Sequence, residues 1–198
     1  MITIVDAGIG NFQSVANMFN FLGINTKILK EPTDISNISH LVLPGVGSFD
    51  TGMNMLEQSG WRKAIEKIQP HIKLLGICLG MQLLTESSEE GKRKGLGFVN
   101  ASCSSFDSRL VTVPHIGWNK VHVTRSNDLM KLDESENRFY FSHSYYVQSS
   151  DQELRTMETE YKTNFIAGYQ KGNIFGVQFH PEKSHRFGME IFRNFANL

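Results

Sequence analysis

Short apolar runs alternate with amphipathic helical patterns through the first half of the chain. The apolar runs are rich in Ile, Val and Leu, and we expect them to form buried strands at residues 2–5, 26–29, 40–43 and 72–77. The segments between them carry apolar residues at helical spacing, and we expect helices at residues 12–22, 53–68 and 79–84. This alternation is typical of parallel strands joined by crossover helices. It predicts an α/β fold whose central, mostly parallel sheet is flanked by helices.

The pattern changes after Gly95. Apolar and aromatic residues then recur with a period of two, which is typical of antiparallel strands, at residues 97–106, 117–124, 138–146 and 165–179. Lys171-Gly172-Asn173 separates two apolar runs and predicts a hairpin connection. A closing helix is predicted by apolar residues that share one face, namely Phe187, Ile191, Phe192 and Phe195. The second half therefore predicts an antiparallel β extension of the sheet, and its polar run at 86–94 predicts a solvated loop.

The composition limits the classes of partner and of site. The chain has 20 basic and 20 acidic side chains, so no bulk charge favours nucleic acid or an anionic membrane. Its apolar start is too short for a signal peptide, and no apolar stretch reaches the length of a membrane span. Cys78 and Cys103 are the only cysteines, which leaves a disulfide framework, a metal site or a redox relay without support. We expect one cytoplasmic domain over residues 1–198, with no metal and no cofactor.

The sharpest motif is Gly76-Ile77-Cys78-Leu79-Gly80, at the point where a buried strand is expected to turn into a helix. A nucleophile in such a turn has a strained backbone, and glycine on either side relieves the crowding. The start of the helix also favours a thiolate over a thiol. A buried structural cysteine between packing glycines would give the same motif. The assignment of Cys78 as a nucleophile therefore depends on other residues.

Such residues occur at Phe179-His180-Pro181-Glu182, where a strand is expected to end in a base and a carboxylate. Pro181 disfavours helical geometry at His180, and residues two apart in an extended segment point the same way. Glu182 can therefore orient the His180 ring and stabilise its protonated form, as the third member of a triad does. A single loop histidine is more often a surface or capping residue. Paired with Cys78, about a hundred residues upstream, His180 becomes a candidate general base and acid.

A third candidate element is Pro44-Gly45-Val46-Gly47, at the end of a neighbouring strand. Its two glycines let the backbone approach a ligand closely and direct peptide N–H groups toward it. With the N–H of Leu79, this segment would form an oxyanion hole. A plain Gly-Pro turn is the alternative interpretation.

A nucleotide-binding loop is a competing hypothesis for the first turn. Gly8-Ile9-Gly10 follows the first strand, and Glu31 comes some twenty residues later, as in dinucleotide-binding folds. Gln13 replaces the third glycine of that motif. Tight packing of the loop explains the two glycines without any ligand, so this hypothesis is the weaker one.

Taken together, Gly76 to Gly80 with Leu83 and the segment Phe179 to Glu182 resemble the class I, triad-type glutamine amidotransferases. The resemblance implies that Cys78 attacks the side-chain amide of glutamine, that His180 transfers the protons and that Glu182 holds His180. It also implies oxyanion donors at Gly47 and Leu79. The residues that would bind glutamine by the same resemblance are Gly45, Gln82, Ser144 and Tyr145.

Further segments resemble one branch of that family, the amidotransferase subunits of imidazole glycerol phosphate synthases. They extend over nearly the whole chain and comprise residues 6–11, 43–47, 95–97, 113–119, 141–145 and 176–184. The resemblance implies a heterodimer in which a (β/α)8 cyclase receives the ammonia for histidine biosynthesis. The residues that would lie toward this partner are Asn11, Trp118, Asn119 and Lys183.

Local structure offers other roles for those four residues: a helix cap, core packing, a turn and a solvated charge, in the same order. Ammonia in water is mostly protonated, so a closed interface that hands over the neutral molecule favours the partner interpretation. The chain departs from the commonest family pattern near the expected partner face, at Ala7, Phe12, Gln13 and residues 184–189. These departures admit a second acceptor, a cyclase-like partner that modifies surface-polysaccharide sugars.

Overall fold

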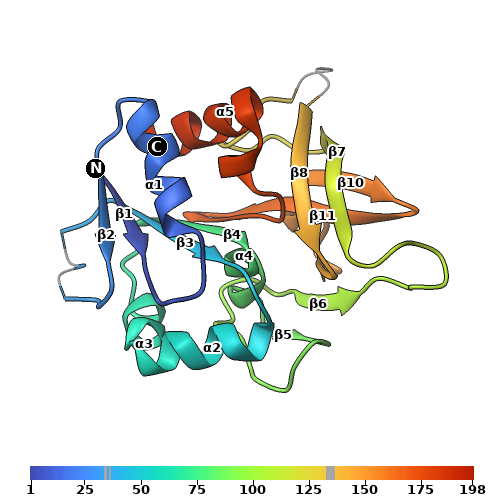
Figure 1. Ribbon diagram of the computed structural model, residues 1–198, viewed down its shortest axis with the longest axis horizontal. Coiled ribbons are helices and arrows are strands. Elements are labelled where there is room, and N and C mark those ends of the chain that lie inside the picture. The colour runs from blue at the N-terminus through green and yellow to red at the C-terminus, as the bar shows by residue number, and fades with distance from the viewer. Residues whose placement is uncertain (34, 36, 133–136) are drawn as a thin grey trace.

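The computed structural model describes residues 1–33, 35, 37–132 and 137–198. Its centre is a mixed sheet with a parallel part, as the first half of the sequence predicts (Figure 1). The parallel strands, in the order in which they lie side by side, are β2 (Thr26–Leu29), β1 (Ile2–Val5), β3 (His40–Gly45), β4 (Lys73–Cys78) and β12 (Ile174–Val177). The carboxyl ends of these strands lie along one edge of the sheet, which is where parallel α/β sheets place their ligands.

The predicted antiparallel extension is also present. From β12 the sheet continues antiparallel through β11 (Thr163–Lys171), β10 (Met157–Tyr161), β7 (His115–Val123) and β8 (Asn137–His143). A branch leaves β11 through β9 (Tyr145–Gln148), β6 (Ser102–Ser105) and β5 (Ser87–Ser88). The turn predicted at residues 171–173 joins β11 to β12. The extension carries β8 and its turn into β9 close to the end of β4.

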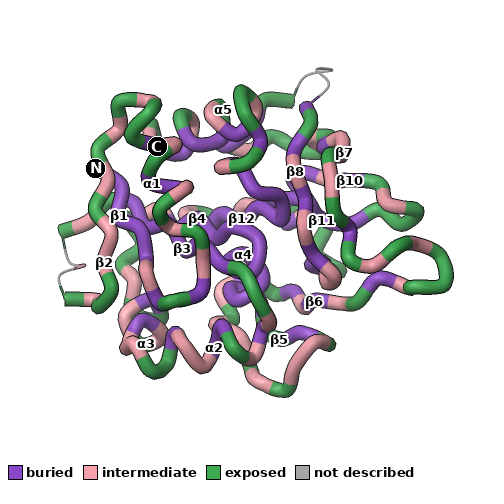
Figure 2. Tube along the Cα trace, viewed as in Figure 1, coloured by how far each residue is buried: buried purple, intermediate pink, exposed green. Residues whose placement is uncertain are grey.

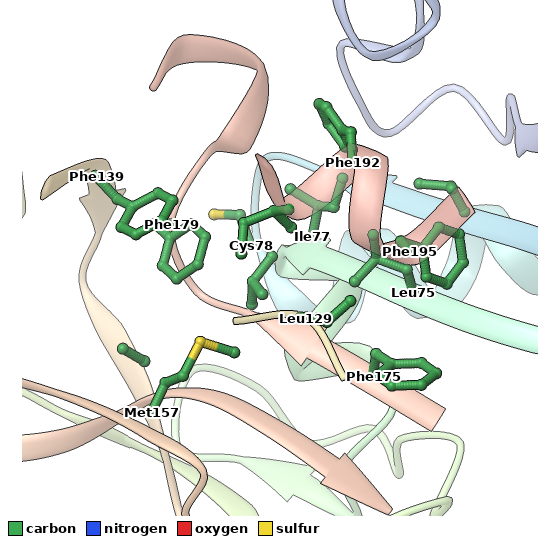
Figure 3. Packing of buried hydrophobic residues seen from close by; sticks show 14 of the residues in the cluster. Leu75, Ile77, Cys78, Leu129, Phe139, Met157, Phe175, Phe179, Phe192 and Phe195 are labelled. Atoms are coloured by element: carbon green, nitrogen blue, oxygen red, sulfur yellow. The ribbon is translucent and has the colours of Figure 1, made fainter. Parts of the chain in front are cut away.

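Helices cover both faces of the parallel part (Figure 1). One face carries α1 (Phe12–Phe21) and α5 (His185–Ala196), and the other carries α2 (Phe49–Gln58), α3 (Trp61–Glu66) and α4 (Leu79–Leu83). Successive residues of β4 alternate between the two apolar clusters: Leu75 and Ile77 pack with α1 and α5, whereas Leu74 packs with α2 and α3. Figure 3 shows the first cluster, with Phe192 and Phe195 of α5 and with Cys78 at the end of the strand.

Because helices cover both faces, the central strands are buried along nearly their whole length (Figure 2). Every residue of β1 and of β3 is buried. This explains why these strands read as continuous apolar runs rather than as alternating ones. Two short 3₁₀ helices, η1 (Gln152–Leu154) and η2 (Pro181–Lys183), complete the elements used below. Within the described residues, no helix has the length and apolar character needed to cross a membrane.

The structure differs from the sequence prediction in three places. The helix expected at 53–68 is two helices, because Gly60 has a left-handed φ of 79° between α2 and α3. The strand expected at 97–106 is limited to β6, since Gly97 has a φ of 68° and the chain around it forms a loop. The strand β10 was not predicted, although its side chains alternate between the buried Met157 and Thr159 and the less buried Glu158 and Glu160.

Candidate active site

The thiol of Cys78 lies where β4 passes directly into α4, as the G-x-C-x-G motif predicts. The backbone angles of Cys78 are φ 53° and ψ −110°, a conformation that residues other than glycine rarely adopt. The residue is 5% exposed. The Cys78 side chain lines a cavity at the carboxyl end of the strands.

Glycines make this strained turn sterically possible. A Cβ added at Gly80 would lie 1.9 Å from the carbonyl oxygen of Leu43, and one added at Gly76 would lie 2.7 Å from backbone atoms of Gly80. A Cβ at Gly45 would lie 2.7 Å from the amide nitrogen of Gly80. Side chains at these three positions would force α4 away from β3 and β4. The glycines on either side of Cys78 therefore let α4 pack directly against the strands.

His180 and Glu182 come from the turn that follows β12. Nδ1 of His180 lies 2.8 Å from Oε1 of Glu182, and His180 is extended ahead of Pro181. The hydroxyl of Ser184 donates to the carbonyl oxygen of His180 at 2.6 Å and accepts from the N–H of Tyr140 at 3.0 Å. The N–H of His180 donates to the carbonyl oxygen of Tyr140 at 2.8 Å. The turn that carries the base is thus tied to β8.

Cys78, His180 and Glu182 form one hydrogen-bonded chain. The carboxylate of Glu182 accepts from Nδ1 of His180, so Nε2 is the ring nitrogen left for the hydrogen bond to Cys78. Burial lowers the pKa of His180, but the hydrogen bonds to Cys78 and Glu182 and their negative charges together outweigh burial and raise it above the ordinary value. The Glu182 side chain is only 3% exposed, and among the described residues its Oε2 has no partner. This arrangement favours the protonated form of the His180 ring, held by the Glu182 carboxylate.

The thiol opens onto a cavity of about 240 Å³. Pockets for drug-sized ligands have roughly 300–1,000 Å³, so this one suits a ligand of few atoms. Its lining includes eight of the residues that the sequence singled out, namely Gly47, Cys78, Leu79, Gln82, Ser144, Tyr145, His180 and Lys183. Two others lie behind this lining: Glu182 holds His180, and Gly45 packs against Leu79 and Gly80.

Gln82 is buried, and its amide nitrogen is already engaged. Its Nε2 donates to the carbonyl oxygen of Tyr145 at 2.8 Å and to Oε1 of Gln178 at 2.9 Å. Nε2 of Gln178 in turn donates to Sγ of Cys78 at 3.7 Å. Both amide hydrogens of Gln82 are therefore used inside the protein, which leaves its side-chain oxygen for a ligand. An acceptor at this place suits an ammonium group. Gln178 had not been singled out from the sequence.

Glu90 also lines the cavity, although its polar segment was expected to be a solvated loop. Oε2 of Glu90 accepts a hydrogen bond of 2.7 Å from the N–H of Phe49, the first residue of α2. Backbone N–H groups of Lys92 and Arg93 donate to Asp50, which fixes the same segment against α2. A carboxylate held in this way can bind a positively charged ligand group. Glu90 was not predicted as a site residue, because it lies in a run of charged residues that is typical of a solvated loop.

The Pro44–Gly47 segment is held by the first loop of the chain. The N–H of Val46 donates to the carbonyl oxygen of Ile9 at 2.7 Å. Gly10 lies so close that an added Cβ would be 3.0 Å from the backbone of Pro44. Close packing thus accounts for Gly10 without a nucleotide. In this conformation the Val46 N–H is engaged, while Gly47 lines the cavity with a φ of 110° that suits glycine.

Two of the residues predicted to face a partner have exposed positions. Asn11 caps α1, where its side-chain oxygen accepts from the N–H of Ser14 at 3.2 Å. Trp118 is 48% exposed on β7, so core packing does not explain it. The ring of His185 stacks on Trp118 with centroids 5.6 Å apart and planes within 3°. The predicted contact of Asn11 and Trp118 with a partner stays a prediction.

The other two residues predicted to face a partner lie nearer the cavity. Lys183 lines it, and its ammonium group lies 5.5 Å from the centre of the Tyr140 ring. Asn119 is half-buried, and its Nδ2 lies within hydrogen-bonding distance of the Glu160 carbonyl oxygen and of His115. The amide hydrogens of Asn119 are used within the chain. A contact of Lys183 or of Asn119 with a partner stays a prediction.

Cys103, the second cysteine, is buried in the opposite apolar cluster from Cys78. Burial raises the pKa of the Cys103 thiol to about 12, against the smaller opposing effect of a hydrogen bond with Thr85. Cys103 therefore stays protonated at neutral pH and is a poor nucleophile. The geometry leaves Cys78 as the candidate nucleophile.

Sequence comparisons place nearly the whole chain in one family. The family model described as glutamine amidotransferase class-I matches residues 3–198. The imidazole glycerol phosphate synthase subunit HisH 2 of Methanococcus maripaludis is 48% identical over 198 residues, which cover 98% of each chain. The subunit HisH of Leptospira borgpetersenii is 41% identical over 204 residues, which cover 100% of each chain.

A solved structure extends the comparison to the fold. A protein from Thermoplasma acidophilum, described as a GMP synthase subunit, superposes with a TM-score of 0.74 at 25% identity, over 100% of this chain and 93% of that one. The strand-to-helix turn at Cys78, the family match over nearly every residue and the shared fold lead to one assignment. The chain belongs to the class I glutamine amidotransferases.

Proposed function

We propose that this chain is the glutaminase subunit of imidazole glycerol phosphate synthase and acts as one domain over residues 1–198. It hydrolyses L-glutamine to glutamate and ammonia, and it supplies the ammonia to a (β/α)8 cyclase subunit in histidine biosynthesis. The observation that carries the proposal is the hydrogen-bonded chain of Cys78, His180 and Glu182 at a small cavity. The pathway rests on the full-length relatives named for that synthase.

The cavity offers partners for the amino-acid end of glutamine. The carboxylate of Glu90 and the side-chain oxygen of Gln82 both accept hydrogen bonds, so we assign them to the α-ammonium group. The Ser144–Tyr145 segment also lines the cavity and is assigned to the same end of the substrate. This orientation directs the side-chain amide of glutamine toward Cys78.

In the first half of the reaction, the thiolate of Cys78 attacks the carbonyl carbon of the substrate amide. The carbonyl oxygen becomes an oxyanion, which the N–H groups of Leu79 and Gly47 stabilise. His180 gives its Nε2 proton to the leaving nitrogen, the C–N bond breaks and ammonia departs. A thioester on Cys78 and a neutral His180 remain. Throughout, Glu182 holds the Nδ1 proton and stabilises the charged ring.

In the second half, water attacks the thioester carbon while Nε2 of His180 removes a proton from it. The tetrahedral intermediate then expels the Cys78 thiolate, and the new carboxylic acid gives its proton to solvent as glutamate leaves. One water is consumed, and one glutamate, one ammonia and one proton are formed. The site returns to its thiolate and imidazolium state.

Exposed apolar side chains beside the cavity support a partner at this face. Val46 lines the cavity and is 48% exposed. Pro114 also lines the cavity and directly precedes β7, on which Ile116 is 60% exposed and Trp118 is 48% exposed. Apolar groups exposed together at the rim of a site are typical of a protein interface. A partner docked here would receive ammonia before it is protonated in solvent.

Reconstitution tests the proposal and its alternative acceptor. The chain is mixed with the cyclase subunit of imidazole glycerol phosphate synthase and with glutamine labelled with ¹⁵N in its side-chain amide. We expect the label to enter the imidazole product, with one glutamine hydrolysed for each product formed. Transfer only to a cyclase-like partner that modifies sugars would assign this chain to that acceptor instead. The test includes this second partner because Ala7, Phe12 and Gln13 differ from the commonest family pattern near the expected partner face.

A further inference from the structure

A row of hydrogen bonds outside the triad runs from β7 into the cavity. Nδ2 of Asn119 lies 3.3 Å from Nε2 of His115, and Nδ1 of His115 lies 3.1 Å from Nε2 of His143. Nδ1 of His143 lies 2.8 Å from the carbonyl oxygen of Tyr145. His115 and His143 are 3% and 7% exposed, and His143 lines the cavity. The catalytic steps described above use neither ring.

The partners at both ends of this row fix the position of every ring proton. A carbonyl oxygen only accepts, so Nδ1 of His143 carries a proton and its Nε2 accepts from Nδ1 of His115. At the other end, Oδ1 of Asn119 accepts from the N–H of Lys120 at 2.8 Å, and Nδ2 donates to the Glu160 carbonyl oxygen at 3.0 Å. The second Nδ2 hydrogen therefore faces Nε2 of His115. Both ends require the same tautomer, with the proton on Nδ1 of each ring.

The same geometry excludes a second proton on either ring. A proton on Nε2 of His143 would face the Nδ1 proton of His115, and one on Nε2 of His115 would face the amide of Asn119. Burial also lowers the pKa of His115 to about 4 and that of His143 to about 3. The two rings are therefore neutral at physiological pH, with a single direction of hydrogen bonding along the row.

The row ends on an oxygen that also positions Gln82. The carbonyl oxygen of Tyr145 accepts from Nδ1 of His143 and from Nε2 of Gln82, each at 2.8 Å. Gln82 uses its other amide hydrogen on Gln178, which donates to Cys78. His143 thus supports the point where the turn between β8 and β9 meets α4. A shift of this carbonyl would move the Ser144–Tyr145 backbone and release the Gln82 amide.

We propose that His143 and His115 are positioning residues of the glutamine site. As two neutral rings in one tautomer, they hold the Tyr145 carbonyl and so keep the Ser144–Tyr145 backbone and Gln82 in the geometry that binds the amino-acid end of glutamine. Asn119 fixes the outer ring. The proposal rests on the glutaminase function proposed above. Because Glu182 orients the catalytic base separately, loss of the row affects glutamine binding more than bond breaking.

The test compares two variants of His143 with a control histidine. His143→Asn keeps an amide donor near the place of ring Nδ1, whereas His143→Leu removes the donor and keeps an apolar side chain. We expect His143→Leu to raise KM for glutamine about tenfold or more with a much smaller change in kcat, and His143→Asn to recover most of that loss. His40→Leu is the control, since His40 is also buried but begins β3, at the end opposite Gly45.

All variants are measured with the partner bound, and their folding is checked by circular dichroism and thermal melting. Glutamine affinity is measured separately in a Cys78→Ala background, where no turnover occurs. A folded His143→Leu variant with wild-type KM would overturn the proposal. Equal losses in His143→Leu and His143→Asn would also overturn it, because rescue by the retained donor separates positioning from packing.

The protonation of the ring nitrogens in the protein with both histidines intact provides a test that does not require His143→Leu to fold. In ¹⁵N NMR spectra of the Cys78→Ala protein at pH 7, we expect protonated Nδ1 and bare Nε2 on His115 and His143. Glutamine should shift the ring signals of His143 and leave those of His40 in place. The opposite tautomer, or no shift at saturating glutamine, would contradict the positioning role. A wild-type complex that does not hydrolyse glutamine would instead contradict the proposed function and leave the tautomers as measured.

Discussion

The N–H of Val46 donates a hydrogen bond to the carbonyl oxygen of Ile9 across 2.7 Å. The bond ties the segment that we assign to the oxyanion hole to the first loop of the chain, two residues before Asn11. In this conformation the Val46 N–H is used by Ile9, so the donors available to the oxyanion are those assigned at Gly47 and Leu79, and the Val46 N–H is not among them. A partner that binds a rearranged segment more tightly would shift the population toward that arrangement.

We therefore predict that the isolated chain is a poor glutaminase. Turnover should rise about 10²- to 10³-fold when the partner is docked and holds its acceptor, the range for one oxyanion donor. The measurement is steady-state glutamine hydrolysis by the chain alone, with partner, and with partner plus acceptor. Equal turnover in the three states would contradict the prediction that partner binding activates glutamine hydrolysis. Stimulation that survives both Asn11→Ala and Lys183→Ala removes only the sensing roles of those residues.

Glu182→Gln should lower glutaminase turnover with little change in stability. The loss of an orienting carboxylate costs on the order of 10⁴ in turnover for the serine triad, which sets the upper end of the expected effect. Gln keeps the shape of the side chain but not the charge that stabilises the His180 imidazolium. Glu190→Gln, on the exposed side of α5, is the matched control. Wild-type turnover in Glu182→Gln would remove this residue from the triad.

Glu90→Gln should raise KM for glutamine by about tenfold, with kcat close to that of the wild type, because a carboxylate in contact with an ammonium group contributes about 1.5–3 kcal/mol. Glu89→Gln is the control: it removes the same charge one residue away, from a carboxylate that binds Ser105 outside the cavity. The measurement is the glutamine dependence of turnover for both variants. A KM increase in Glu89→Gln as large as that in Glu90→Gln would show that Glu90 affects glutamine binding only through its charge and not through a direct contact.

The buried histidine pair predicts how stability depends on pH. The ordinary pKa of histidine is 6.5, whereas the folded-state values are about 4 for His115 and about 3 for His143. Between these values the unfolded chain binds more protons than the folded one. The free energy of unfolding should therefore fall as pH falls below 6.5, by up to about 1.4 kcal/mol per pH unit for each ring.

The raised pKa of His180 has the opposite sign, and its contribution is complete below pH 6.5. It therefore does not mask the acid effect. Urea unfolding of the wild type and of His143→Asn at pH 7 and pH 5 checks this prediction. The variant should lose less stability than the wild type between the two pH values. Identical pH dependence in both proteins would mean that His143 is not held neutral by the fold.

The positions of the candidate catalytic residues in the fold were predictable because their sequence signals are local. Glycines on either side of Cys78 indicate a crowded strand-to-helix turn. The two-residue spacing across Pro181 places the Glu182 carboxylate beside His180. The alternation of apolar runs and helices likewise predicted the parallel part of the sheet, because strands covered on both faces read as apolar runs.

Other residues of the site were not predicted, because their positions depend on contacts between segments far apart in the sequence. His115 and His143 face each other only because β7 and β8 pair in a register that sets these two residues opposite one another. Glu90 reaches the cavity because its segment is fixed against the start of α2, by bonds to residues about forty positions earlier. No short pattern in the sequence records either relationship.

The central claim is that Cys78 is the nucleophile of a glutaminase, and mass spectrometry after treatment with a thiol-reactive glutamine analogue tests it most directly. We predict one equivalent of label on Cys78, none on Cys103, and protection by glutamine. The Cys78→Ala variant should take up no label and should hydrolyse no glutamine, while its partner still works with added ammonia. Label on Cys103, or glutamine hydrolysis by Cys78→Ala, would contradict the account.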